Sequence, residues 1–395
     1  MKTAVHTIKP PSGELLLKST MAKGKILHIL NYYSPHLGGI EDVCKSIVDG
    51  TPEFERKVLC YNDINQNARE YVDGVEVIRA GLWKETARQQ ISLHFPAIYR
   101  RLLREYQPDI IQLHVPNPLT SAIVLTHLPR RTRLILHWHS DITVHRNIHF
   151  CYSPIEKWML RRADAIIATS PNYIKASPYL LPHAGKCTVI PNVVSQKKLD
   201  TPCAQEDIER LHKQYGDDIV LFLGRHVPYK GLEYLIEAIP KVTRSCTFLI
   251  CGKGPETDRL KAMADGLPNV VFLGRIADEQ LSTYMRAAKI FAFPSITKNE
   301  AFGIALAEAM YYGAVPVTFT IDGSGVNWVN LADVTGLEVP NRDTTAYAAA
   351  IDRLIGDDEL RERFATAARK RITDNFLLEH IHGKLIELYD RLLNR

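Results

Sequence analysis

The sequence predicts an α/β protein made of two doubly wound, Rossmann-like domains that face a cleft. Three observations favour this fold. Short apolar runs alternate with helical patterns along most of the chain, which is typical of βαβ units and a parallel sheet. The alternation stops in a polar stretch near 191–217 and then restarts. The chain has 395 residues, more than a single hydrophobic core usually organises.

The first half of the chain predicts an N-terminal domain over 24–198, preceded by a loose extension over 1–23. Helical patterns occupy His94–Tyr106 and Pro154–Arg162. Strands are expected at Lys25–Leu30, Lys57–Cys60, Val75–Arg79, Ile110–Leu113, Leu134–Leu136, Ala165–Ala168 and Thr188–Ile190.

The second half predicts a C-terminal domain over 199–376. A helix over Leu232–Ile239 ends at Pro240. The last segment, Leu377–Leu393, has apolar residues along one stripe, and we expect this helix to cross back to the first domain. Strands are expected at Ile219–Leu223, Thr247–Cys251, Val270–Leu273, Ile290–Phe293, Val315–Thr318 and Gly336–Val339.

The composition is that of an ordinary globular protein, with 46% hydrophobic and 24% charged residues. A net charge of +5 is too weak to argue for nucleic acid as a partner. Seven cysteines without a C-x-x-C pair favour a reducing compartment over a disulfide framework or a zinc ribbon. No apolar run is long enough to span a membrane, and the first residues make neither a signal peptide nor an anchor. We therefore expect a cytoplasmic protein, or one on the cytoplasmic face of the inner membrane.

The stretch from Ile296 to Phe319 carries the strongest signal for a site. It contains Glu300, the small flexible Gly303 and a helical pattern over Ile304–Tyr312. The first N–H groups of that helix, from Phe302 onward, have no partner within the helix and would point toward the end of the preceding strand. Such a terminus binds anions, phosphate above all.

Two carboxylates accompany this terminus, Glu300 before it and Glu308 on the helix. Because a carboxylate accepts two hydrogen bonds from a diol, the pair suits sugar hydroxyls. The alternative interpretation is a strand–loop–helix unit with two solvated glutamates. A second glycine turn, Gly38–Gly39, opens a helix after the first strand, but it lacks the full G-x-G-x-x-G spacing of a dinucleotide site.

Seven segments follow one another along the chain: GGIE, HWHSD, IPN, GRHVPYKG, CGKGP, EAFGIALAEAM and TGLEVP. In this order they resemble the retaining GT-B glycosyltransferases, which use nucleotide-diphospho-sugars. The resemblance covers nearly the whole chain from about Lys25. It is nearest to bacterial mannosyltransferase-like enzymes of lipopolysaccharide O-antigen and exopolysaccharide assembly. The segment GSGVNWVN, Gly323 to Asn330, is similar to that of enzymes that use GDP-mannose or GDP-rhamnose.

The resemblance implies a role for each candidate site residue of the second domain. Arg225 and Lys230 would clamp the diphosphate of the donor, where negative charge develops as the bond to the sugar breaks. Glu300 would contact the transferred sugar, and Glu308 would hold the ribose hydroxyls. Arg275 falls where the base pocket lies in the family.

His139, in HWHSD, corresponds to the histidine of the first domain that faces the donor sugar. Its ring would hydrogen-bond a hydroxyl or assist proton movement. Gly38, Gly39 and the backbone of Phe302–Ile304 complete the expected donor-binding set. For retention we expect Glu300 to position the donor while departure and attack share one face of the sugar.

A metal site is the competing interpretation of the histidines. His137 and His139 share a strand face, and His145 and His149 follow closely. No cysteine or carboxylate has matching ligand spacing, so we interpret His137 as a strand-end residue. The chain also lacks any Asp-x-Asp pair, the usual cation bridge to a sugar nucleotide. We therefore expect catalysis without metal or cofactor.

Basic and aromatic residues cluster in the first domain. Such faces attract anionic lipid head groups at about 1 kcal/mol per well-placed cation, although ordinary solvated helix faces look the same in sequence. The expected partners are thus a nucleotide-sugar donor, a glycan or polyprenyl-diphosphate-linked acceptor, and an anionic membrane surface. The cluster comprises Phe95, Tyr99, Arg100, Arg101, Arg104, Lys157, Trp158, Arg161 and Arg162.

Two other functions share this architecture. Non-hydrolysing nucleotide-sugar 2-epimerases have it too, but they are expected to lack a Gly38–Gly39 loop combined with an EAFG unit. A non-catalytic sugar-binding derivative is the second alternative. Five residues that are present together argue against such decay: Glu300, Glu308, Arg225, Lys230 and His139.

Overall fold

The computed structural model describes residues 22–36, 38–86, 89–141, 146–194 and 199–394. The chain divides into two compact units, each with its own sheet. Unit 1 comprises Met1–Ala168, Pro182–Ile190 and His382–Arg395, and unit 2 comprises Thr169–Leu181 and Pro191–Ile381. Thr169–Leu181 therefore groups with unit 2, although it lies within the expected first domain. One reason is local, because the Thr169 hydroxyl donates a 3.1 Å hydrogen bond to the carbonyl of Ala301.

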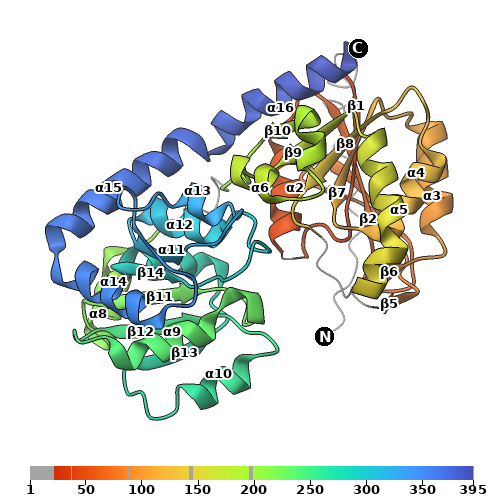
Figure 1. Ribbon diagram of the computed structural model, residues 1–395. Helices are drawn as coiled ribbons and strands as arrows, with labels where there is room; N and C mark the ends of the chain where they lie inside the picture. The colour runs from red at the N-terminus through yellow and green to blue at the C-terminus, as the bar shows by residue number, and fades with distance from the viewer. Residues whose placement is uncertain (1–21, 37, 87–88, 142–145, 195–198, 395) are drawn as a thin grey trace. The chain divides into compact units, whose positions relative to one another are not determined.

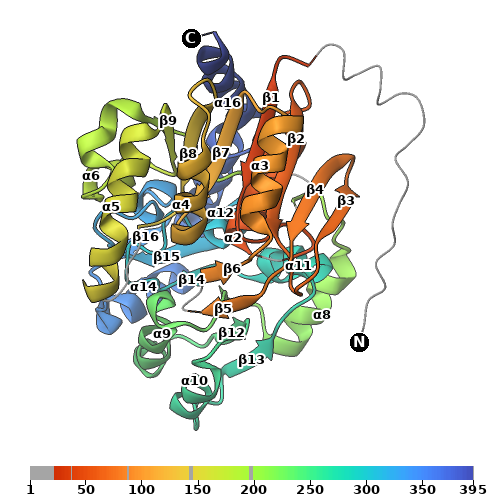
Figure 2. The ribbon, with the colours of Figure 1, turned by 90° about the vertical axis from the view of Figure 1, so that its right-hand side faces the viewer.

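Unit 1 is built on an eight-stranded sheet in the order β10-β9-β8-β7-β1-β2-β4-β3, and Figure 2 shows β1, β2, β7 and β8 side by side. All neighbours are parallel except β3, which is antiparallel to β4. The strands are β1 (Lys25–Ile29), β2 (Glu55–Tyr61), β3 (Ala68–Val72), β4 (Val75–Ala80), β7 (Ile110–Val115), β8 (Arg133–Trp138), β9 (Ala165–Ala168) and β10 (Cys187–Val189).

The helices of unit 1 are α2 (Gly39–Asp49), α3 (Phe95–Glu105), α4 (Pro118–His127) and α5 (Arg146–Arg162). The predicted helix starting at Pro154 is too short, because that proline lies inside α5. The sequence interpretation also missed β3 and a small hairpin of β5 (Lys84–Thr86) and β6 (Gln89–Ile91).

Unit 2 has a six-stranded, fully parallel sheet in the order β13-β12-β11-β14-β15-β16. Helices cover both of its faces (Figure 1), with α9 packed on α14 and α8 packed on α11. The strands are β11 (Ile219–Leu223), β12 (Thr247–Cys251), β13 (Val270–Gly274), β14 (Ile290–Phe293), β15 (Val315–Phe319) and β16 (Leu337–Val339). The helices are α6 (Pro171–Ala176), α8 (Gln205–Tyr215), α9 (Leu232–Ala238), α10 (Thr257–Met263), α11 (Asp278–Ala287), α12 (Ile304–Tyr312), α13 (Val326–Val329), α14 (Thr344–Gly356) and α15 (Asp358–Asn375).

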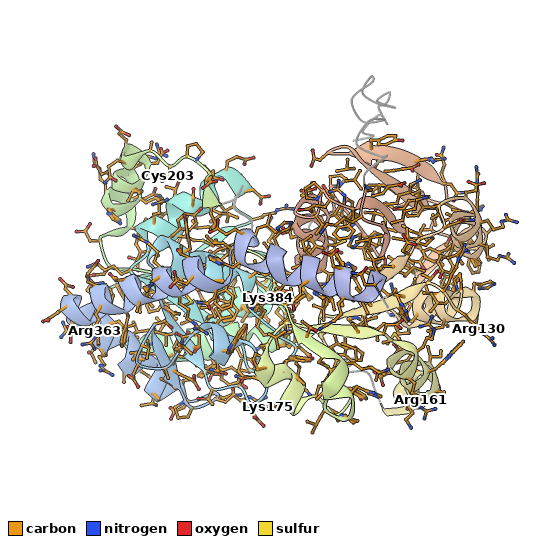
Figure 3. All side chains as sticks on the ribbon, turned by 90° about the horizontal axis from the view of Figure 1, so that it is seen from above. Arg130, Arg161, Lys175, Cys203, Arg363 and Lys384 are labelled. Carbon is orange, nitrogen blue, oxygen red and sulfur yellow. The ribbon has the colours of Figure 1, made fainter. Side chains whose placement is uncertain are left out.

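The last helix, α16 (Leu378–Leu393), starts in unit 2 and belongs to unit 1 from His382 onward, as the predicted crossing helix requires. Figure 3 labels Lys384 on it. Tyr389 lies on its buried stripe, and the Tyr389 hydroxyl donates a 2.6 Å hydrogen bond to the side-chain carbonyl of Gln112 on β7. Among the described residues, no helix is both long and apolar enough to cross a bilayer.

Candidate functional site

The strand order of unit 2 reverses between β11 and β14. In parallel α/β sheets, ligands bind outside the carboxyl ends of the strands at such a reversal. The loops that leave these two strands, 224–231 and 294–303, contain Arg225, Lys230 and Glu300. Topology therefore brings the three predicted residues to one edge of the sheet.

Lys230 and Glu300 form an ion pair at this edge. Both side chains are only 12% exposed. The hydroxyl of Ser295 donates a 3.2 Å hydrogen bond to the same Glu300 carboxylate, and the Lys230 ammonium lies 4.9 Å from the centre of the Phe293 ring. Glu300 is thus a buried, paired carboxylate and not a solvated glutamate.

The backbone around Glu300 is held as well. The ammonium of Lys298 donates a 3.4 Å hydrogen bond to the carbonyl of Ala176. The hydroxyl of Ser324 donates to the backbone carbonyl of Glu300.

Glycines let the loops of this edge pack against one another. A Cβ added at Gly231 would lie 2.1 Å from the carbonyl oxygen of Pro294, and one at Gly252 would lie 1.8 Å from that of Gly224. Gly231 also has φ 63°, a left-handed conformation that favours glycine. No side chain fits at either position, so the loop carrying Lys230 sits directly on the loop carrying Glu300.

His226 is a residue of this edge that sequence reasoning missed. Its side chain is buried, and its Nδ1 lies 3.0 Å from the hydroxyl of Thr257. Its backbone N–H donates to the carbonyl of Lys253, and its carbonyl accepts from the N–H of Glu256. His226 therefore ties the loop after β11 to the loop after β12 and leaves the adjacent Arg225 exposed. Its position inside GRHVPYKG was the available signal.

The helix after Glu300 has the bounds that the sequence predicts, Ile304–Tyr312. Gly303 is its N-cap with φ 89°, which explains the glycine. The Phe302 ring packs edge-on against Phe376, with 5.4 Å between ring centres. At the helix terminus Phe302 therefore offers its backbone N–H as a hydrogen-bond donor. This terminus lies on the same loop as Glu300.

Glu308 and Arg275 lie further along the same unit. Glu308 is 8% exposed and lines a narrow crevice against α11. Arg275 is exposed directly after β13. The crevice is formed by Leu199, Asp278, Leu281, Ser282, Met285, Glu308 and Tyr312.

In unit 1, Gly38 is the N-cap of α2 and Gly39 is its first residue, as predicted. Glu41 and Asp42 occupy the first turn of the helix. A Cβ at Gly38 would lie 2.2 Å from the carboxylate of Glu41. A carboxylate of the protein therefore already lies at this terminus, which makes it a weaker anion site than the start of α12.

Four buried histidines lie on one face of the unit 1 sheet, near the carboxyl ends of three adjacent strands. His28 on β1 is in register with Gln112 on β7, and His114 on β7 is in register with His137 on β8. His139 follows His137 by two residues and so shares its face. Nδ1 of His114 lies 3.0 Å from Nε2 of His139, whose ring stacks on His137 at 4.2 Å between centres. His137 thus lies at the end of β8, as predicted, and is also part of a buried cluster.

The rings of this cluster form a hydrogen-bonded stack. Nitrogen or sulfur atoms of two sets, His28, Cys44 and His114, and His114, His137 and His139, lie within 4.8 Å of one another. However, His139 is tilted by only 13° from His114 and 19° from His137. Lone pairs lie in the ring planes, so stacked rings aim them side by side and not at one tetrahedral point. His145 lies outside the described residues, and metal independence stays a prediction.

The basic and aromatic face of unit 1 is smaller than predicted. Phe95 and Tyr99 are buried in the core. Arg101 pairs with Glu105 on its own helix, and Arg162 holds the carboxylate of Asp164. Arg161 remains exposed, and Figure 3 labels it on the surface.

Comparisons with known proteins cover most of the chain. The family model "Glycosyl transferases group 1" matches residues 204–371, and "Glycosyl transferase 4-like domain" matches residues 38–193. The chain is 29% identical to the O-antigen chain mannosyltransferase C of Escherichia coli over 93% of this chain and 99% of the relative. It is 30% identical to the D-rhamnosyltransferase WbpZ of Pseudomonas aeruginosa over 89% and 92%.

Solved structures show the same fold. The Anabaena protein Alr3699/HepE, crystallised in complex with UDP-glucose, superposes with a TM-score of 0.73 at 19% identity. The match covers 93% of this chain and all of that one. Two Rossmann-like units joined in one chain, the architecture expected from the sequence, are thus the GT-B fold.

Proposed function

Because the chain belongs to the GT-B glycosyltransferases of the group 1 and family 4-like type, we propose that it transfers a hexose from a nucleotide-diphospho-sugar with retention of anomeric configuration. The donor is a GDP-sugar, GDP-mannose first, with UDP-sugars as the alternative. The acceptor is a glycan or a polyprenyl-diphosphate-linked saccharide of O-antigen or exopolysaccharide synthesis. The name of the Escherichia coli relative supports a mannosyl donor and the O-antigen pathway, and the name of the Pseudomonas aeruginosa relative supports a D-rhamnosyl donor.

The observation that carries the proposal is the buried Lys230–Glu300 pair at the strand reversal of unit 2. Breaking the bond between sugar and diphosphate leaves negative charge on the phosphate. A fixed ammonium beside it stabilises the transition state more than the ground state. Lys230 carries three N–H donors, so it can hold Glu300 and a phosphate oxygen together. Arg225, exposed on the same loop, adds a second cation.

Glu300 acts in this proposal as the group that orients the sugar. Its carboxylate accepts from Lys230 and Ser295, and the remaining acceptor capacity suits one diol of the donor. The leaving phosphate takes the proton of the attacking hydroxyl on the same face of the ring, so no covalent sugar–enzyme bond forms. Positive charge comes from Lys230, Arg225 and the start of α12, which supports metal-independent transfer.

The choice of guanine rests on the likeness of Gly323–Asn330 to users of GDP-sugars. In the structure this segment supports Glu300, because Ser324 donates to the Glu300 carbonyl. Asn330 is buried, and its amide donates to Thr318 and Leu337. The segment thus acts on the site by holding Glu300 in position. The nucleotide base of the donor is determined by the experiment below.

A thermal-shift series with GDP, UDP and ADP, followed by turnover of the matching nucleotide-sugar, tests the proposal. At a hundred times its Kd a ligand stabilises the folded protein by about 2.7 kcal/mol. For a domain of this size that is a rise in Tm of about 5–10 °C. We expect GDP to give the largest rise and GDP-mannose to be consumed. A protein that no nucleotide stabilises and that consumes no nucleotide-sugar would refute the proposed function.

We also propose that unit 1 meets the acceptor at an anionic membrane surface. Arg100, Arg104 and His127 line an open depression of about 550 Å³ between α3 and the end of α4. Sedimentation with vesicles of anionic and of neutral lipid tests this step. Binding to the anionic vesicles should weaken in Arg100→Glu/Arg104→Glu, and equal binding to both vesicle types would contradict it.

A further inference from the structure

The ring of His139 is held by its neighbours within unit 1. Nε2 of His139 lies 3.0 Å from Nδ1 of His114, and the His139 ring also stacks on the ring of His137. His137 is in turn held by Gln112, whose amide nitrogen lies 3.2 Å from His137 Nδ1. His114 is 2% exposed and His139 7% exposed, so His114 reaches a ligand only through His139.

Both rings of the hydrogen-bonded pair are neutral. Burial, together with the charges that His137 and His139 would carry, lowers the pKa of His114 well below its ordinary value. Burial alone lowers the pKa of His139 to about 3. Each ring therefore carries one proton at neutral pH, and the hydrogen bond between them contains one of the two.

The burial of His114 decides which of the two rings donates the proton in this hydrogen bond. Its second nitrogen, Nε2, is buried and has no hydrogen-bond partner among the described residues. A buried N–H without an acceptor is less well tolerated than a buried lone pair. The His114 proton therefore sits on Nδ1 and is donated to Nε2 of His139. His139 then carries its own proton on Nδ1.

We propose that His114 is a positioning residue that fixes His139 as the Nδ1–H tautomer and thereby makes it a neutral hydrogen-bond donor to an oxygen of the bound substrate. This inference rests on the proposed function for the identity of that oxygen. Because Nε2 is already occupied, His139 has no free lone pair for the proton of the acceptor hydroxyl. It orients the sugar, and the proton leaves with the phosphate.

Nitrogen-15 NMR of the histidine rings in the full-length protein tests the tautomer directly. Long-range correlations from the carbon-bound ring protons identify which nitrogen is protonated, and the His139→Gln variant assigns the signals. We expect the His139 ring to be protonated at Nδ1. Protonation at Nε2 would overturn the proposal, whatever the activity of the protein.

Three variants test the consequence for transfer. His114→Leu removes the donor, and we expect kcat to fall about 10- to 100-fold while KM for the donor changes little. His114→Asn places an amide N–H where Nδ1 was, so it should restore most of the activity. His28→Leu is the matched control, because His28 is equally buried in the cluster and makes no hydrogen bond to His139.

A purely structural role for His114 predicts a different pattern. Both leucine variants would then lower Tm and kcat together, and that result would refute positioning. Wild-type kcat in a folded His114→Leu protein would refute it as well. If the wild-type protein turns over no nucleotide-sugar, the proposed function is wrong, and the NMR spectrum still decides the tautomer.

Discussion

Lowering the pH from 7 to 5 should destabilise unit 1, because its four clustered histidines resist protonation. Burial lowers the pKa of His28 and of His139 to about 3, and that of His114 and His137 well below the ordinary value. The charge of Arg56 adds to the effect at His28. The unfolded chain takes up these protons near its ordinary pKa of about 6.5, and the folded chain does not. Stability is therefore complete above about pH 7 and falls as the pH falls.

The magnitude follows from the two pKa values. One histidine with a folded pKa of about 3 costs about 2 kcal/mol of unfolding free energy between pH 7 and pH 5. His28 and His139 together cost about 4 kcal/mol, a large part of the stability of a typical domain, about 5–15 kcal/mol, and His114 and His137 act in the same direction.

Urea unfolding at a series of pH values, read by tryptophan fluorescence, measures this loss. A Trp328→Phe background removes the tryptophan of unit 2, so that the signal reports unit 1. His28→Leu should remove one proton from the linkage and lower the pH slope below pH 5.5 by about 1.4 kcal/mol per pH unit. An unfolding free energy of unit 1 that stays constant within about 1 kcal/mol from pH 7 to 5 would refute the reasoning.

Arg225→Ala and Lys230→Ala should each lower kcat/KM about a hundredfold in donor-turnover assays, and near-wild-type turnover would place the diphosphate elsewhere. Activity should survive excess EDTA; a preparation that dies with EDTA and revives with Mn²⁺ or Mg²⁺ would contradict metal independence. The Glu300→Gln and Glu300→Asp variants should be impaired but active. Intact-mass spectrometry of the wild-type protein with donor alone should show no sugar adduct. An adduct on Glu300 that the acceptor removes would mean double displacement. In a double-mutant cycle, the effects of Lys230→Met and Glu300→Gln on the unfolding free energy should be non-additive by about 1–3 kcal/mol. The reason is that each single change leaves a largely buried charge or amide without its partner. Additive effects would mean that the pair is not maintained in solution.

Local signals predicted the parts of the site that depend on local geometry. The bounds of α12 follow from its apolar pattern and from two glycines, Gly303 at its start and Gly313 at its end, both with positive φ. The edge of the sheet that carries Arg225 and Lys230 follows from strand order, which the alternation of elements and the family resemblance imply together.

Contacts between residues far apart in the chain could not be predicted from local sequence patterns. Lys230 and Glu300 are 70 positions apart, so their pairing depends on β11 and β14 being neighbours. The sequence places His137 at the end of its strand, but its buried neighbours come from β7 as well as β8 and do not follow from that position. The exposure of Phe95 and Tyr99 was misjudged because a basic helix face hides which of its aromatic residues point inward.

The glycine contacts among the loops that follow β11, β12 and β14 set limits for directed evolution of this protein. Gly231 and Gly252 each lie against a carbonyl oxygen of the adjoining loop, so a library that varies one loop alone will mostly yield variants whose loops no longer close. Under the proposed function, altered donor preference is better sought at Arg275, whose exposed side chain leaves those contacts intact. Where a larger change is wanted, segments 224–231, 252–257 and 294–303 should be exchanged together as one block from a single homologue.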